Sequence, residues 1–210
     1  MSTTPEIECR PNGPLKVKSV ADLRNSRDES LPTEPVMFLC RCGGSANKPF
    51  CDGTHKKNGF SSAKGSDGSE DRLDHYKGRA ITIQDNRSIC AHAGVCTDTL
   101  AAVFKYGSEP WIDPDGADAR AAIETIRKCP SGALSYSVAA PVEPAEPRTP
   151  AITVSKDGPY NVVGRIGLPG EPRGEGASLE HYTLCRCGAS KNKPFCDGSH
   201  WDVGFKDEKN

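Results

Sequence analysis

The chain has few of the residues that build a large hydrophobic core. Only 35% of its 210 residues are hydrophobic and 6% are aromatic, whereas 21 are glycine and 17 are proline. Small units with so little apolar surface need a further source of stability, such as a bound metal centre. We therefore expect a loop-rich fold built from small units rather than one large domain.

The chain also lacks an excess of charge and a long apolar run. Lys and Arg number 27 against 28 Asp and Glu, giving a formal net charge of -1, which argues against nucleic acid or an anionic membrane as partner. No apolar run approaches the length of a membrane span, and residues 1–9 lack the basic start and apolar middle of an export signal. We expect a cytoplasmic protein.

Cysteine, in contrast, is abundant, with 10 residues in the chain. A reducing cytosol and clustered C-x-C spacing both favour metal or cluster ligation over disulfides. Cys9 stands alone at a position equivalent to Val154 in the repeat described below, so we expect it in a buried strand without a redox role. The others form three groups of three, which are Cys40, Cys42 and Cys51; Cys90, Cys96 and Cys129; and Cys185, Cys187 and Cys196.

Two of these groups lie in a motif that occurs twice. Residues 40–55 read CRCGGSANKPFCDGTH and residues 185–200 read CRCGASKNKPFCDGSH. Both copies have the spacing C-x-C-x8-C-x3-H, so His55 and His200 each join three thiols. Each copy thus offers four potential metal ligands.

Three cysteines and one histidine suit two kinds of metal centre. A 2Fe-2S cluster needs two ligands on each iron, and a C-x-C pair can hold one iron while the later Cys and His hold the other. The same donors suit tetrahedral zinc, although zinc ligands usually come as C-x2-C pairs. The spacing favours iron and sulfur. The small residues Gly43, Gly44, Gly188 and Ala189 would let backbone amides approach the sulfides.

The repeat extends well beyond the motif, over about residues 5–60 and 150–205, without a gap. After the third thiol, Asp52 and Asp197 are good N-cap residues for a short helical turn that presents the histidine. β-prone runs separated by Gly-Pro turns precede each first thiol. The expected strands lie around Ile7, at Leu15–Val20 and at Val36–Leu39, and again at Ile152–Val154, Tyr160–Ile166 and His181–Leu184.

Residues 79–138 have a different character and form a separate unit between the repeats. Strands are expected at Ala80–Ile83 and Ala133–Tyr136. A helix between them should follow Asp115 or Asp118 and end before Pro130. The apolar face of this helix contains Ala119, Ala122, Ile123 and Ile126. Residues 64–74 form a soft joint on one side and residues 139–150 a Pro-rich linker on the other.

The middle unit contains its own cysteine pattern. Bacterial ferredoxins use C-x2-C-x2-C and a remote C-P, and this segment keeps the first, third and remote cysteines with Ala93 where the second belongs. The three thiolates of Cys90, Cys96 and Cys129 suit a 3Fe-4S cluster. His92 or a non-protein ligand could instead complete a 4Fe-4S cluster.

The duplicated motif C-x-C-x2-S-x3-P-x-C-D-G-[ST]-H resembles the CDGSH iron-sulfur domain of the NEET family, in its tandem bacterial form. In that family the three Cys and the His bind one 2Fe-2S cluster, and two units interlock as a β-capped dimer. The resemblance implies an α+β fold in which repeats 1–64 and 151–210 form a pseudo-dimer within one chain. The middle unit resembles the divergent single-cluster ferredoxin family through Trp111–Gly116 and Cys129–Leu134, which implies a small α+β ferredoxin-like insert.

The chain shows no nucleophile-base pair, phosphate loop, or flavin or nicotinamide fingerprint, so we expect no enzymatic activity. The leading hypothesis is electron transfer, storage and transfer of 2Fe-2S clusters, or both. The alternatives are a redox or iron sensor that donates clusters to acceptor proteins, and the electron-carrying subunit of an oxidoreductase. The expected partners are redox or cluster-acceptor proteins. Because one chain carries both halves of the pseudo-dimer, we expect a monomer.

Overall fold

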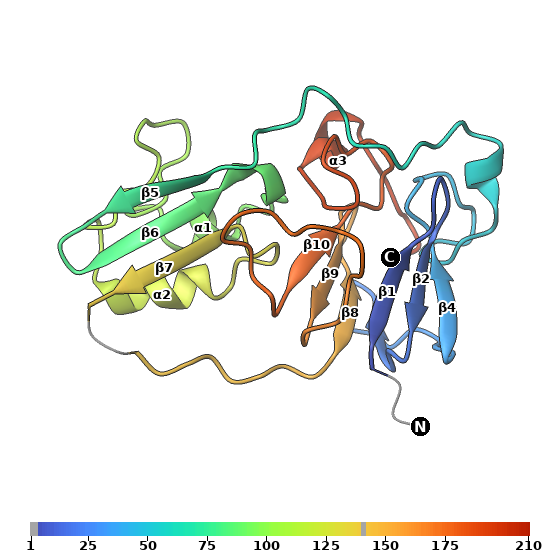
Figure 1. The fold of residues 1–210 in the computed structure, drawn as a ribbon, viewed down its shortest axis with the longest axis horizontal. Helices are drawn as coiled ribbons and strands as arrows, with labels where there is room; N and C mark the ends of the chain where they lie inside the picture. Colours follow the sequence, from blue (N-terminus) through green and yellow to red (C-terminus); the bar gives the residue numbers. More distant parts are fainter. Residues whose placement is uncertain (1–3, 140–141) are drawn as a thin grey trace.

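The structure is a computed structural model that describes residues 4–139 and 142–210. It contains two three-stranded sheets, one four-stranded sheet and a few short helices, which confirms the α+β class. Figure 1 shows the two repeats side by side, with the sheet of the middle unit at the opposite end of the molecule from β4 (Val36–Leu39) of the first repeat. Within the described residues, no helix has both the length and the apolar character that a membrane span requires.

Each repeat builds an antiparallel sheet from strands close to the expected positions. In the first repeat the order is β1-β2-β4, and in the second the corresponding order is β8-β9-β10. Buried and partly exposed residues alternate along β2 and β9, as a strand with one face on the core requires. The strands are β1 (Glu6–Cys9), β2 (Leu15–Lys18), β4 (Val36–Leu39), β8 (Ala151–Val154), β9 (Tyr160–Val163) and β10 (Tyr182–Leu184).

A strand missing from the sequence analysis joins the two repeats. β3 (Asp22–Arg24) leaves its own repeat and pairs in parallel with β8, placing Asp22 opposite Ala151. In return Gly167 forms a parallel bridge with Glu6 on β1. Asp22 and Gly167 occupy matching positions in the two repeats, as do Glu6 and Ala151, so the exchange is reciprocal. The repeats are therefore related by a pseudo-twofold axis, and backbone pairing at these two places joins them.

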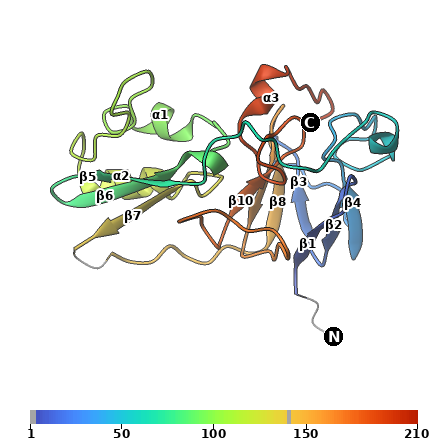
Figure 2. The same cartoon turned by 45° about the horizontal axis from the view of Figure 1, so that its top comes forward.

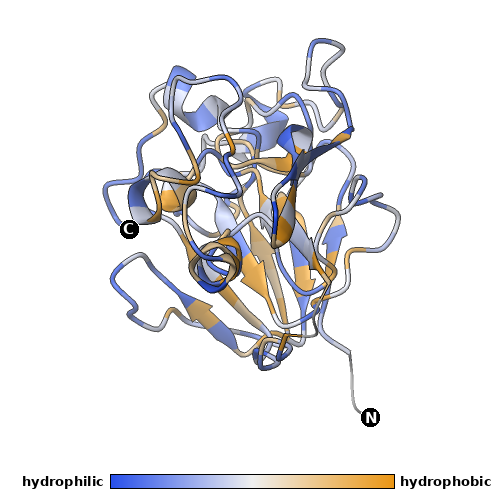
Figure 3. Ribbon diagram, turned by 90° about the vertical axis from the view of Figure 1, so that its left-hand side faces the viewer, coloured by the Kyte–Doolittle hydropathy of each residue, from blue (hydrophilic) through white to orange (hydrophobic). Residues whose placement is uncertain are grey.

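The two repeat sheets enclose a common hydrophobic core. Inward-facing residues such as Ile7 and Val17 from the first repeat, and Ile152 and Val162 from the second, have no exposed surface. These side chains belong to one continuous cluster, and Figure 3 shows the apolar strands gathered inside the molecule. Cys9 lies half-buried on β1, where burial raises the pKa of its thiol to about 12. It packs against this core as an apolar residue.

The middle unit is an antiparallel sheet, in the order β5-β6-β7, packed against a helix. The expected helix is confirmed as α2 (Ala119–Ile126), and its N-cap Asp118 accepts a hydrogen bond from the Ala121 N–H at 2.9 Å. Strand β5 (Leu73–Lys77) was not predicted. It begins within residues 64–74, which were expected to form a joint, and ends before residue 79, where the middle unit was expected to start. The remaining elements are β6 (Ile81–Asn86), the 3-10 turn η2 (Arg87–Ile89), α1 (Val95–Thr99) and β7 (Leu134–Val138).

The connections between units run along the surface of the molecule, as Figure 2 shows. The described part of the Pro-rich linker, residues 142–149, contains no helix or strand. Residues 140–141 of this linker and residues 1–3 of the first repeat lie outside the described residues.

Candidate iron-sulfur sites

The expected ligands of each repeat come together as two pairs. In the first repeat the Sγ atoms of Cys40 and Cys42 are 3.7 Å apart, and Cys51 Sγ lies 3.4 Å from His55 Nδ1. In the second repeat the matching distances are 3.7 Å for Cys185 and Cys187, and 3.5 Å for Cys196 Sγ and His200 Nδ1. The geometry is thus the same in both copies.

These distances fit ligands that share a tetrahedral metal. Two thiolates bound at about 2.3 Å lie about 3.8 Å apart at a tetrahedral centre, and a thiolate and an imidazole nitrogen about 3.5 Å apart. Within residues 4–139 and 142–210, no three His, Cys, Asp or Glu side chains are grouped closely enough to surround one metal ion. The donors therefore form two pairs rather than one set of four. This arrangement fits a binuclear iron-sulfur cluster better than a single zinc ion.

The aspartate of each motif ties the two ligand pairs together. Asp52 accepts hydrogen bonds from the Ala46 N–H in the C-x-C loop and from the Thr54 N–H before His55. These hydrogen bonds, chiefly those from Thr54, hold the pKa of Asp52 well below its usual range. Asp197 makes the same pair of contacts, with Lys191 and Ser199.

The turn that carries each histidine begins one residue later than expected. The motif predicts Asp52 and Asp197 as the N-caps of these turns, η1 (Thr54–Lys56) and α3 (Ser199–Asp202). The N-caps are instead Gly53 and Gly198, both in the left-handed region, with φ of 88° and 89°. The chain must turn sharply between the third thiol and the histidine, and glycine adopts this conformation without a steric cost.

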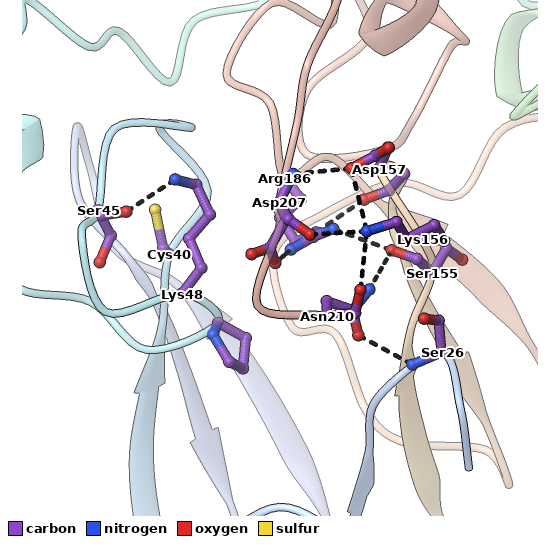
Figure 4. A network of polar contacts seen from close by, with 12 residues as sticks. Ser26, Cys40, Ser45, Lys48, Ser155, Lys156, Asp157, Arg186, Asp207 and Asn210 are labelled. Carbon is purple, nitrogen blue, oxygen red and sulfur yellow. Dashed lines mark hydrogen bonds and ion pairs between the residues drawn. The ribbon is translucent and has the colours of Figure 1, made fainter. Parts of the chain in front are cut away.

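The arginine inside each C-x-C pair has a structural role that the sequence analysis did not assign. Arg41 donates from Nε to Gly13 O at 2.8 Å and from Nη2 to Arg10 O at 2.7 Å. Arg186 makes the matching bonds in the second repeat and also pairs with the buried Asp207, as Figure 4 shows. Both arginines are almost fully buried. They fix the cluster loop to the turn between the first two strands of its repeat.

The two C-x-C loops also touch each other across the pseudo-twofold axis. A Cβ atom on Gly43 would lie 2.4 Å from Cys187 O, and one on Gly188 would lie 2.8 Å from Cys42 O. The Tyr160 hydroxyl, which comes from β9 of the second repeat, donates to Cys40 O at 2.6 Å in the first. The two ligand loops are therefore packed backbone against backbone.

Burial controls the charge of the metal-free thiols. It raises the pKa of Cys40 to about 11 and raises the pKa of Cys196 further. The pKa of Cys187 is lowered, because the hydrogen bond with Cys185 favours its thiolate. Protonated thiols must lose their protons to bind a metal, so cluster binding releases protons and is favoured by rising pH.

The cysteines of the middle unit line a single cleft of about 1440 Å³. Cys90 follows η2, Cys96 lies on α1, and Cys129 follows α2. Burial raises the pKa of the Cys90 thiol to about 11, and Arg87 Nη1 lies 3.9 Å from its Sγ. The cleft can thus hold an iron-sulfur cluster on three thiolates.

His92 also lines this cleft, and its ring faces the second repeat. A Cβ atom on Gly198 would lie 2.8 Å from His92 Cδ2, and the Trp201 indole N–H donates to His92 O at 3.3 Å. Asp197, Gly198 and Trp201 form part of the cleft wall. The cluster site of the middle unit is therefore adjacent to the CDGSH motif of the second repeat.

Comparisons with known proteins agree with these sites. The model of a family described as iron-binding zinc finger, CDGSH type, matches residues 12–56 and 157–201. The chain belongs to the CDGSH family. Residues 76–139 of this CDGSH protein match a second family, described as divergent 4Fe-4S mono-cluster. The chain is an iron-sulfur protein with a single-cluster ferredoxin domain between its two CDGSH repeats.

Two curated relatives cover a smaller part of the CDGSH protein. The uncharacterized protein YjdI of Escherichia coli K12 is 39% identical to it over 61 residues, which are 29% of this chain and 80% of the relative. YjdI of Escherichia coli O157:H7 matches with the same identity and coverage. No solved structure matches the chain.

Proposed function

We propose that this CDGSH protein is an electron carrier that passes single electrons between redox proteins and has no catalytic step of its own. Iron-sulfur clusters, when bound, supply one-electron reduction and oxidation. The observation that carries the proposal is the contact between neighbouring cluster sites within one chain. The C-x-C loops cross at Gly43 and Gly188, and His92 of the middle unit packs against Gly198.

The protein's own groups prepare these sites for a change of charge. The Gly53 N–H donates to Cys51 Sγ and the Ala189 N–H donates to Cys187 Sγ, each at 3.4 Å. Such hydrogen bonds stabilise negative charge on ligand sulfur and help to set a reduction potential. The buried Arg41 and Arg186 hold the loops in place, so the ligands need little rearrangement.

The function is tested by mixing the reduced protein with two acceptors. With an oxidised ferredoxin, we expect the visible spectrum to show reduction of the ferredoxin while the CDGSH protein keeps its iron. With an apo-ferredoxin of the 2Fe-2S type, we expect no gain of cluster on the same time scale. Transfer of intact clusters to the apo-ferredoxin without electron transfer to the oxidised one would contradict the proposal.

That opposite result would support the second candidate function, which is the storage and donation of 2Fe-2S clusters. One observation favours it specifically. Cys51 and His55 in the first repeat are partly exposed, whereas their counterparts Cys196 and His200 are buried, with 3% and 5% of their surface exposed. The first repeat would then be the donor site, and the iron that remains after transfer would be bound in the second repeat and the middle unit.

We expect each repeat to hold one 2Fe-2S cluster and the middle unit to hold a 3Fe-4S cluster. Iron and acid-labile sulfide analysis of freshly purified protein should give the content of two binuclear clusters and one three-iron cluster. The physical reason is that the repeats offer two ligand pairs each, whereas Cys90, Cys96 and Cys129 offer three thiolates. Stoichiometric zinc without labile sulfide would contradict the assignment.

The type of the middle cluster is decided by electron paramagnetic resonance. Three thiolates without a fourth protein ligand should give the signal of an oxidised 3Fe-4S cluster, and His92→Ala should leave it unchanged because Cys90, Cys96 and Cys129 supply the ligands. A reduced 4Fe-4S signal that disappears in His92→Ala would instead show that His92 is the fourth ligand.

A further inference from the structure

The two repeats share a fold, yet matching residues differ strongly in exposure. Phe38 on β4 has 44% of its surface exposed, whereas Thr183, at the same position on β10, has 1% exposed. His55 is partly exposed and His200 is buried. The edge strand and the histidine are therefore open in the first repeat and covered in the second, whereas Trp201 and Asp202 next to His200 stay exposed.

The middle ferredoxin domain is what covers this face of the second repeat. The Asn192 side chain donates to Ser88 O at 2.8 Å, and Ser178 N donates to Gly132 O at 3.4 Å. A Cβ atom on Gly132 would lie 2.5 Å from Ser178 Cβ and 3.2 Å from His181 O, just before β10. An iron-sulfur domain thus sits over β10 and beside the CDGSH motif.

The matching face of the first repeat carries the same features without a cover from the described residues. Val36 and Phe38 on the edge strand β4 have 41% and 44% of their surface exposed. Asn47, the counterpart of Asn192, is exposed, and a Cβ atom on Gly53 would meet no described atom within 4 Å. Figures 1 and 2 both place β4 at the end of the molecule far from β5–β7.

The charges around the two faces differ. Lys56 and Lys57 are exposed next to His55, at the positions that Trp201 and Asp202 occupy next to His200. Lys16 on β2 lies directly opposite Phe38 on β4, and the second repeat has Asn161 at the position of Lys16. Of the acidic residues around this face, Glu6 and Glu8 are within ion-pair distance of Lys18, and Asp52 accepts hydrogen bonds from the Ala46 and Thr54 N–H groups. Glu34 is exposed two residues before Val36. The open face is thus apolar at its centre and basic beside the histidine.

We propose that this open face, formed by Val36, Phe38, Lys56 and Lys57, is the docking surface for a separate ferredoxin-type electron carrier with an acidic surface. The inference rests on the proposed electron-transfer function. The position of the partner follows from the internal symmetry, because the chain already holds one ferredoxin-type domain at the equivalent place on the second repeat. The sign of its charge follows from Lys56 and Lys57. Docking there places the partner beside Cys51 and His55, the more exposed ligand pair of the two repeats.

The test is binding of an acidic bacterial-type ferredoxin to the cluster-loaded full chain, measured by calorimetry at low and high salt. The double variant Lys56→Glu, Lys57→Glu should weaken binding by at least about 10-fold at low salt, and the difference should shrink as ionic strength rises. Phe38→Thr, which copies the residue found at position 183, should weaken it by about 3- to 10-fold. The matched control is Lys77→Glu, Lys128→Glu, which reverses two exposed charges in the middle unit and should leave the affinity unchanged.

The outcomes separate this surface from the proposed function. If the ferredoxin is reduced but binds all variants equally, the docking surface is wrong and the electron-transfer function stands. If the parent reduces neither ferredoxin nor a small-molecule dye, the proposed electron-transfer function is wrong, and the docking proposal that rests on it is wrong as well. If sedimentation shows that the parent self-associates through this face, that Phe38→Thr abolishes the association and that ferredoxin does not compete, the occupant is a second copy and the proposal is overturned.

Discussion

Replacing Gly43 with alanine is expected to destabilise the protein by about 2–5 kcal/mol, with loss of cluster from both repeats. The new methyl group would lie 2.4 Å from Cys187 O and 3.0 Å from its carbonyl carbon, and a backbone atom cannot move aside as a flexible side chain can. Gly43 also has φ of 76°, a conformation that costs about 1–2 kcal/mol for a residue with a Cβ atom. The measurement is thermal unfolding followed by circular dichroism and by visible absorbance of the clusters.

Two further variants separate the steric clash from the backbone strain. Gly53→Ala introduces the same methyl group at φ of 88°, but with no described atom within 4 Å, so it should show only the smaller conformational cost. Gly188→Ala meets Cys42 O at 2.8 Å and should resemble Gly43→Ala. If Gly43→Ala and Gly53→Ala have equal melting temperatures, the two ligand loops do not pack as described. A drop of about 2–4 °C is expected for each kcal/mol in a chain of this length.

The ligand pairs could be predicted from the sequence because their geometry is local. Cys40 and Cys42 are two residues apart, and Cys51 and His55 are joined by a sharp turn and one turn of helix, so spacing alone brings each pair together. Most strands of the repeats were predicted for the same reason, since alternating apolar residues such as Leu15 and Val17 indicate a half-buried strand. The structure contains these strands and brings the predicted ligands of each repeat together in pairs.

The exchanged strand β3 could not be predicted from such signals. Asp22–Arg24 has one apolar residue in three, and its partner β8 belongs to the other repeat. Pairing of this kind depends on contacts far apart in sequence, which a local pattern does not contain. Gly43 and Gly188 also have a long-range role that a local sequence pattern does not predict. They were expected to admit backbone amides toward sulfide, but each also provides room for the opposite ligand loop.

The difference between the two repeats is likewise absent from the motif. Residues 40–55 and 185–200 are nearly the same sequence, yet His200 is buried and His55 is partly exposed. The residues that follow each histidine do indicate a difference between the two repeats. Lys56 and Lys57 suit a solvated face, whereas Trp201, although 62% exposed, donates its indole N–H to His92 O of the middle unit.

Replacing Arg186 with methionine is expected to destabilise the protein by about 3–5 kcal/mol, because it leaves a buried carboxylate without its partner. The Arg186 side chain has no exposed surface and that of Asp207 has 3% exposed. The same substitution leaves Gly158 O and Ser155 O without the donor from which they accept at 2.7 Å and 2.9 Å. The melting temperature should fall, and cluster absorbance of the second repeat should be lost at a lower temperature than that of the first.

Arg41→Met is the matched control, because Arg41 occupies the equivalent place in the first repeat but has no acidic residue at the position of Asp207. Arg41 also donates to two backbone oxygens, at 2.8 Å and 2.7 Å, but the position equivalent to Asp207 is Ser62, which carries no charge. Its loss should cost only about 1–3 kcal/mol for the unsatisfied acceptors. Adding Asp207→Asn to Arg186→Met removes the unpaired charge and should recover part of the lost stability. Equal losses for Arg41→Met and Arg186→Met, with no recovery in the double variant, would show that the ion pair with Asp207 does not stabilise the second repeat.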